Sequence, residues 1–200
     1  MLKAQPNRYL RSSTGDPRVG VSTVPKELVT KVRTFYQQGG RDYCLPYSFA
    51  SGLRYCGFEH AATEIASYED LFSYLPTDWA LDVLENMMLS LAPVIGRARK
   101  FNIKGKKKMS VKELLEDETP YPTLVIPKGK NGYCGHCICV VDNLIFDPIT
   151  PFALRLNQES LTWIFGVEVT KLHFVYRFMI KESPEGIRIK EKYKRKMVHH

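Results

Sequence analysis

The chain has 200 residues and a net charge of +8, and 44% of its residues are hydrophobic. A chain of this length and composition can bury one sizeable core without disulfides or metal ions, so we expect one domain. No apolar stretch reaches the roughly 18 to 20 residues that cross a membrane, which excludes a membrane-spanning helix and a membrane partner for these residues.

The cysteines argue against a disulfide framework. There are five, an odd number, and three lie within the six residues CGHCIC. We expect Cys137 and Cys139, which alternate along an apolar run, to pack in the core together with Cys56. Free thiols fit an intracellular reducing compartment, the cytoplasm or the nucleus.

The positive charge is concentrated in two segments. Residues 97–108 carry seven basic and no acidic residues, and residues 181–200 carry seven basic and three acidic ones. These segments contribute +7 and +4, so the rest of the chain sums to −3. They are either a solvated loop and tail or a site for nucleic acid or another polyanion, and the sequence leaves both readings open.

The first half of the chain has helical periodicity. We predict a helix over residues 25–38 and another from Cys44 to the turn at Gly57, with Pro46 in its first turn. Two more helices are predicted at about residues 60–75 and 78–91. One face of the last is expected to carry Trp79, Val83, Met87 and Leu91.

The second half changes to strand patterns. Ser110 and Glu113 form a capping box that opens a short helix. Short apolar, β-branched runs then predict strands at residues 123–127, 136–141, 144–148 and 172–181, with Asp142-Asn143 as a two-residue hairpin turn. Helices followed by an antiparallel sheet give an α+β fold. We assign residues 1–24 to a flexible lead-in, 25–180 to the domain and 181–200 to a basic tail.

Cys44 is the candidate nucleophile. It lies at the start of a predicted helix, where unpaired N–H groups favour a thiolate. A nearby imidazole is the second common means of activating cysteine, and His60, His136 and His173 are the candidates. We favour His136, because it follows a glycine-containing loop and opens a strand, so that its ring can lie at the mouth of a cleft.

The predicted hairpin supplies a third residue. With Asp142-Asn143 as the turn, Ile149 faces His136, and Asp147 is its diagonal neighbour on the same face of the sheet. A carboxylate there would fix the imidazole tautomer and support the imidazolium. Before the helix, the side-chain amide of Gln38 can lie beside the thiol and stabilise an oxyanion.

These residues carry a resemblance to a known superfamily. Gln38, five residues, Cys44 and a helix, then much later a Gly-His pair ending at His136 and an Asp-Pro pair beginning at Asp147, resemble papain-like cysteine peptidases over about residues 35–165. The chain is most similar to their bacteriocin-processing-type branch, although Leu45 stands where that branch usually has glycine. Its nucleophile region, GRDYCLPYSFAS, is also similar to that of ovarian-tumour-type deubiquitinases.

The resemblance implies a papain-like fold and hydrolysis of a peptide or isopeptide bond in a polypeptide substrate. By resemblance, Cys44 is the nucleophile, His136 the general base, Asp147 its orienting acid and Gln38 the oxyanion-hole residue. We expect neither a cofactor nor a metal ion.

Two other classes of function stay open. Cys134, His136 and Cys137, with Cys56 or His60, could bind zinc, although structural zinc sites normally have two paired ligand clusters. Alternatively, the domain is a catalytically inactive interaction module that binds a polyanion through its basic segments. One hyper-reactive cysteine would identify the peptidase, whereas metal-protected thiols would identify the zinc module.

Overall fold

A computed structural model describes residues 24–37, 44–68, 77–91, 95–101, 108–128 and 136–180. The expected basic tail, the lead-in before Val24, Gln38 and Cys134 lie outside these residues. None of the helices in the described part of the chain is long and apolar enough to cross a membrane.

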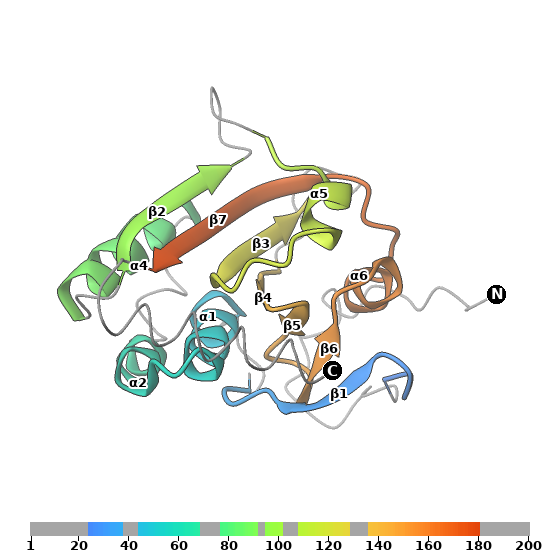
Figure 1. Cartoon of the computed structure of the whole chain (residues 1–200), viewed down its shortest axis with the longest axis horizontal. Coiled ribbons are helices and arrows are strands. Elements are labelled where there is room, and N and C mark those ends of the chain that lie inside the picture. The colour runs from blue at the N-terminus through green and yellow to red at the C-terminus, as the bar shows by residue number, and fades with distance from the viewer. Residues whose placement is uncertain are drawn as a thin grey trace, which may run out of the picture.

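The described residues form a mixed α+β structure around one sheet (Figure 1). In chain order the elements are β1 (Val29–Arg33), α1 (Cys44–Tyr55), α2 (Glu59–Ser67), α4 (Thr77–Leu91), β2 (Ile95–Phe101), α5 (Val111–Leu115), β3 (Thr123–Pro127), β4 (Ile138–Val141), β5 (Leu144–Phe146), β6 (Phe152–Arg155), α6 (Gln158–Phe165) and β7 (Leu172–Ile180). Among these elements, seven strands pair antiparallel in the order β1-β6-β5-β4-β3-β7-β2. The predicted α+β class is confirmed.

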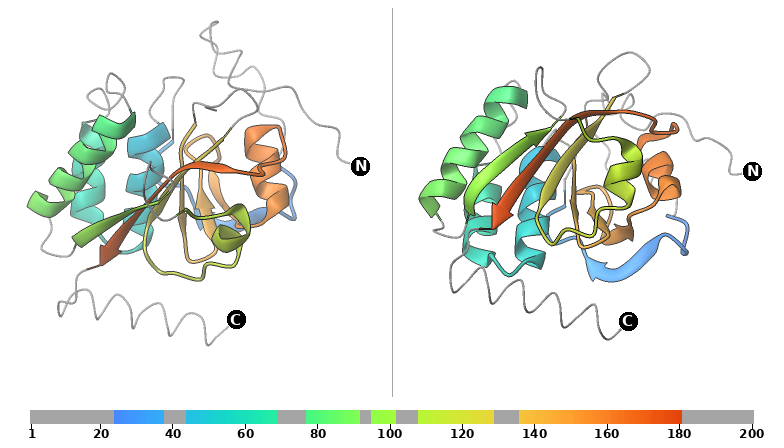
Figure 2. Two further views of the ribbon diagram at one scale, coloured as in Figure 1. Left: turned by 90° about the horizontal axis from the view of Figure 1, so that it is seen from above. Right: turned by 45° about the horizontal axis from the view of Figure 1, so that its top comes forward.

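Helices cover both faces of the sheet. Seen from above, α1, α2 and α4 lie on one side, and α5 and α6 lie on the other (Figure 2). The strands alternate accordingly: Leu124 and Cys139 pack in the cluster with α1, whereas Val125 and Ile138 pack in the cluster with α5 and α6. Strands buried on both faces read as continuous apolar runs, which is why β3 and β4 are recognisable in the sequence.

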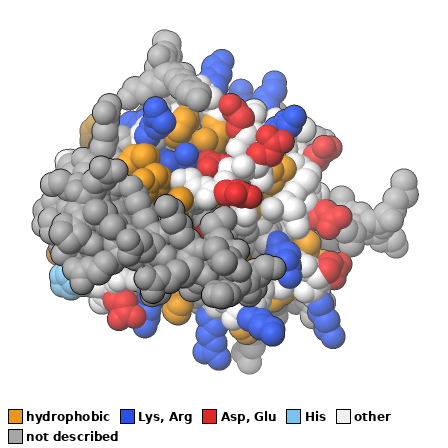
Figure 3. Space-filling model, viewed as in Figure 1, with side chains coloured by type: hydrophobic (Ala, Val, Ile, Leu, Met, Phe, Trp, Pro, Cys, Tyr) orange, Lys and Arg blue, Asp and Glu red, His pale blue; other side chains and the backbone are white. Residues whose placement is uncertain are grey.

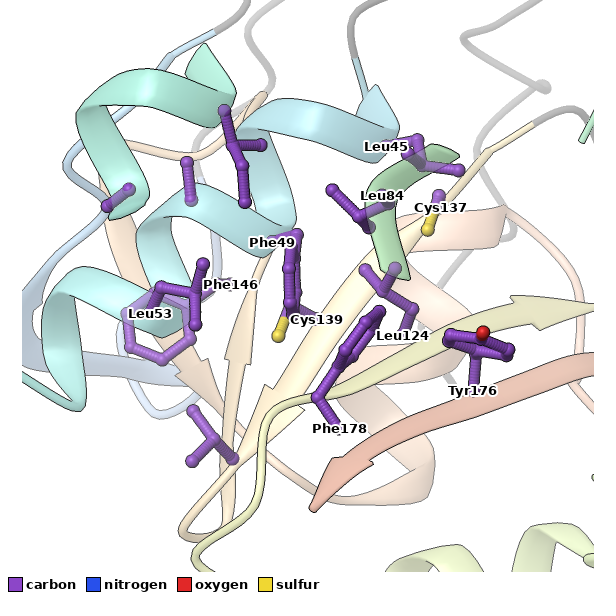
Figure 4. Packing of buried hydrophobic residues seen from close by; sticks show 14 of the residues in the cluster. Leu45, Phe49, Leu53, Leu84, Leu124, Cys137, Cys139, Phe146, Tyr176 and Phe178 are labelled. Carbon is purple, nitrogen blue, oxygen red and sulfur yellow. The ribbon is translucent and has the colours of Figure 1, made fainter. Parts of the chain in front are cut away.

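Helix α1 is the central element of the larger core cluster. Phe49 and Leu53 are fully buried, and the Phe49 ring lies 4.2 Å, centroid to centroid, from that of Phe178 on β7. Figure 4 shows this packing, with Cys139 of β4 beside Phe49. Gly52 makes the close approach of helix and sheet possible, because a Cβ there would lie 2.5 Å from Cys139 Sγ and 3.5 Å from Cys139 Cβ.

Replacing Gly52 with alanine is expected to destabilise the fold. Forcing a methyl group into a filled core costs about 1 to 3 kcal/mol. Alanine in place of glycine in a helix interior returns about 1 kcal/mol. We therefore expect the free energy of unfolding to fall by up to about 2 kcal/mol in urea denaturation.

The matched control removes the atom that clashes. In a Cys139→Ala background the Sγ is gone, so adding Gly52→Ala should cost much less than it does in the wild-type chain. If the losses in free energy of unfolding from the two substitutions simply add in the double variant, this contact does not limit the helix-to-sheet distance.

The predicted β4–β5 hairpin is confirmed, including its register. Asp142 and Asn143 both have positive φ, 53° and 56°, as a two-residue type I′ turn requires. Cys139 pairs with Phe146 as predicted. The Tyr55 hydroxyl donates to Asp142 Oδ2 at 2.7 Å, which ties the end of α1 to the turn. Burial, and then this bond, raise the pKa of Tyr55.

The predicted helix at residues 25–38 is wrong. Leu28 is buried, but the chain continues as β1, which pairs with β6 through Val29↔Leu154 and Arg33↔Phe152. The β-branched residues of Val29–Arg33 suit a strand, and β6 offers a partner that local spacing cannot reveal. The sheet thus includes β1 and β2 from the first half of the chain, contrary to the expected order of helices first and sheet second.

The predicted helix at residues 78–91 is observed as α4, but the predicted apolar stripe is not its buried face, and the side chain of Leu91 lies outside the described residues. Trp79 is 66% exposed, whereas Ala80, Leu81 and Leu84 are buried. Val83 and Met87 only border the core. Both stripes have helical spacing, and packing against α2 and β2 selects between them. The preceding predicted helix, residues 60–75, is observed as α2 and ends at Ser67, and residues 69–76 lie outside the description.

The basic segment 97–108 is not a loop throughout, because its first part belongs to β2, an edge strand. Two of the cations at this edge are already paired: Lys100 contacts Asp82 and Glu85 of α4, and Arg177 of β7 contacts Asp117. Figure 3 shows Lys and Arg side chains interspersed with Asp and Glu on one face of the described residues. Of the basic residues in segment 97–108, Lys100 is therefore already paired with acids of the same chain.

Candidate active site

Cys44 is the first residue of α1, as predicted, and is partly exposed. No acidic residue occurs in the first turn, so nothing there opposes a thiolate at the positive end of the helix. Leu45 and Phe49 are buried on the core side of the helix. The packing of α1 thus fixes the position of the thiol.

His136 and Asp147 form a buried pair at the same end of the sheet. His136 lies two residues before β4, and Asp147 directly follows β5. The distance from His136 Nε2 to Asp147 Oδ1 is 3.1 Å, and the side chains are 2% and 1% exposed. The structure brings together the two residues that the hairpin register relates. The predicted pair of His136 with Ile149 does not form, because β5 ends at Phe146 and the chain turns.

The His136 imidazole also interacts with Cys44. Burial alone would lower the pKa of His136, but the charge and hydrogen bond of Asp147, followed by the hydrogen bond and charge of Cys44, raise it from 6.5 to about 10. Because Nε2 is engaged by Asp147, Nδ1 is the nitrogen left for the thiol. The imidazole therefore lies between a carboxylate and a thiol, as in a nucleophile–base–acid triad.

Further contacts hold the pair in place. Asp147 Oδ1 also accepts a hydrogen bond from the backbone N–H of Ile149 at 3.0 Å. The ring of Phe165, the last residue of α6, lies 5.9 Å from the His136 ring, centroid to centroid, and is 5% exposed. Phe165 shields the imidazole from water. Its role was not predicted, because neither α6 nor its packing was anticipated from the sequence.

The other predicted site residues have different positions. Gln38 lies outside the described residues, and its neighbour Gln37 is exposed. Cys56, Cys137 and Cys139 are buried, as expected, and all the described cysteines are free thiols. Burial raises the pKa of the Cys139 thiol well above its usual value, and the nearby Cys56 adds to this, so Cys139 is unsuited to nucleophilic attack.

The residues proposed as zinc ligands are only partly described. Cys134 lies outside the description. Among described residues, no group of three or more His, Cys, Asp or Glu side chains is placed to hold a metal ion. The His136 imidazole interacts with Asp147 and Cys44, and His60 is exposed on α2.

Comparison with known proteins gives no relative from which a role could be transferred. No protein-family model matches the chain. Neither a curated protein nor a solved structure matches it. The chemistry of this site must therefore be inferred from Cys44, His136 and Asp147 themselves.

Proposed function

We propose that the protein is a papain-like cysteine peptidase that hydrolyses peptide or isopeptide bonds in polypeptides. One observation carries the proposal: a single buried imidazole, His136, has Asp147 on one side and Cys44, at a helix N-terminus, on the other. Cys44 and the two hairpin residues, which are distant from it in the sequence, are arranged in the order that a thiol nucleophile, its base and an orienting acid require.

The first half of the proposed reaction forms an acyl-enzyme. The Cys44 thiolate attacks the scissile carbonyl carbon, and the carbonyl electrons move onto oxygen. When this tetrahedral intermediate collapses, the C–N bond breaks and the His136 imidazolium gives its proton to the leaving amine. The product is a thioester on Cys44 and a free amine.

The second half returns the enzyme to its starting state. His136, now neutral, takes a proton from water, whose oxygen attacks the thioester carbonyl. The C–S bond breaks, a carboxylic acid leaves, and the thiolate–imidazolium pair is restored. Gln38 is proposed to donate to the oxyanion in both steps. The reaction needs a reduced Cys44, which fits the proposed cytoplasmic or nuclear location.

Selective alkylation tests the nucleophile without knowledge of the substrate. Limiting iodoacetamide at mildly acidic pH should label mainly Cys44, because a thiolate stabilised by His136 and the helix terminus reacts while other thiols stay protonated. Labelling should be lost in His136→Ala. Peptide mapping by mass spectrometry measures both.

His60→Ala is the matched control, because this histidine is exposed on α2 and should leave the labelling unchanged. Comparable labelling of several cysteines would contradict the proposal. About one zinc per chain in elemental analysis, with thiols that react only after chelation, would instead favour the zinc module.

A further inference from the structure

The turn that follows β5 holds Asp147 at two points. Its carboxylate Oδ1 accepts from the backbone N–H of Ile149, and its backbone carbonyl accepts from the backbone N–H of Thr150 at 3.0 Å. Pro148 between them has no N–H to compete for the carboxylate. This turn therefore determines where Asp147 presents its carboxylate to His136.

The hydroxyl of Thr150 is the side-chain anchor of this turn. Thr150 Oγ1 lies 3.0 Å from the carbonyl oxygen of Asp147 and 2.9 Å from that of Phe152, and Thr150 is 1% exposed. Its single proton can go to either carbonyl, so the hydroxyl links the residue after β5 to the first residue of β6. Carbonyl groups of the chain itself therefore accept the hydrogen bond of this buried hydroxyl.

We propose that Thr150 is a positioning residue of the triad, acting through Asp147 on His136. This inference rests on the proposed function. Thr150 does not contact the thiol or the imidazole in any observed bond. Its hydroxyl limits rotation of the turn, and so keeps Asp147 Oδ1 within hydrogen-bond distance of His136 Nε2. Without the hydroxyl, the carboxylate should sample positions in which it supports the imidazolium less well.

The direction of the resulting pH effect follows from the groups around His136. In the described residues, the titratable groups facing it are Asp147, from the turn, and Cys44, from α1, and α6 contributes only the apolar ring of Phe165. Asp147 raises the pKa of His136, so loosening Asp147 must lower it. The imidazolium would then lose its proton at a lower pH than in the wild-type protein.

The test is the rate of Cys44 alkylation by iodoacetamide as a function of pH, with the site mapped by mass spectrometry on the full chain. In the wild type we expect one change in rate when the thiol ionises and a second when His136 loses its proton. In Thr150→Val the second change should move to lower pH by about half to one pH unit, as expected for the loss of one hydrogen bond. Thr150→Ser, which keeps the hydroxyl, should restore the wild-type profile.

Thr34→Val is the matched control. Thr34 is also buried, at 3% exposure, but its Oγ1 has no hydrogen-bond partner among the described residues, so its loss should not alter the profile. If Thr150→Val does not fold, Thr150→Ala removes the same hydroxyl without placing a methyl group in its position. The positioning role would be overturned if the rate change assigned to His136 stayed at the wild-type pH in the folded Thr150→Val or Thr150→Ala variant. It would also be overturned if Thr150→Ser shifted that rate change as far as Thr150→Val does. Absence of selective Cys44 labelling in the wild type would overturn the proposed function as well.

Discussion

Replacing Cys44 with alanine should abolish hydrolysis while leaving the fold intact. In the proposed mechanism the substitution removes the atom that forms the acyl-enzyme, and losses of a hydrolase nucleophile are on the order of 10⁴- to 10⁶-fold in kcat. Cys44 is only partly buried, so little packing is lost. Cleavage of a peptide library prepared from denatured proteins, followed by mass spectrometry, measures the effect without a known substrate.

Cys56→Ala is the matched control, because Cys56 is the cysteine at the opposite end of α1. Cys56 is buried just after the last residue of α1, and its loss should lower stability modestly without changing kcat. Cleavage that persists at the wild-type rate in Cys44→Ala would exclude Cys44 as the nucleophile. Loss of cleavage in both variants would point to a folding defect, which thermal unfolding would reveal.

Gln38→Ala should lower kcat by about 10²- to 10³-fold, the usual effect of removing one oxyanion donor. Iodoacetamide labelling of Cys44 should persist, because the thiolate–imidazolium pair does not involve the amide. Gln38 itself lies outside the described residues, but the backbone N–H of Tyr36 donates to Ser51 Oγ of α1 at 3.1 Å, so the described chain before it is attached to the helix that begins at Cys44. Cleavage of the same peptide library measures kcat.

Gln37→Ala is the matched control for this prediction. Gln37 is exposed, so its replacement should leave rate and stability within error of the wild type. The opposite ranking of the two variants would show that Gln37 is the oxyanion donor. Equal, small effects of the two substitutions on kcat would show that neither side-chain amide stabilises the oxyanion.

Features set by neighbouring residues were predictable. Ser110 and Glu113 form the predicted capping box, with Ser110 Oγ accepting from the Glu113 N–H at 3.1 Å. Helix α1 ends before Gly57, which has a φ of 89°. Helix α6 had comparable signals that were not used: Asn157 caps its start, and Gly166, at φ 68°, ends it. In each case the chain satisfies its own terminal N–H and C=O groups, so distant contacts are not required.

Features that depend on a distant partner were not predictable. Residues 25–38 have apolar spacing that suits a helix, but pairing with β6 completes the hydrogen bonds of Val29–Arg33 as a strand. Trp79 and Leu84 lie on competing faces of α4, and only the packing against α2 and β2 buries Leu84. Lys100 of β2 and Arg177 of β7 are likewise paired with acids from α4 and from the segment after α5.

The candidate site divides in the same way. The sequence alone placed His136 and Asp147 on the two arms of one hairpin, because a two-residue turn fixes the β4–β5 register, but the turn after the end of β5 brings the Asp147 carboxylate to the imidazole. Only the tertiary structure decided that Cys44 meets the other side of the imidazole. That contact requires α1 to lie close against β4, which the missing side chain of Gly52 permits. The contacts of Phe165 and Thr150 also depend on how elements pack, because local spacing cannot specify which surfaces become neighbours.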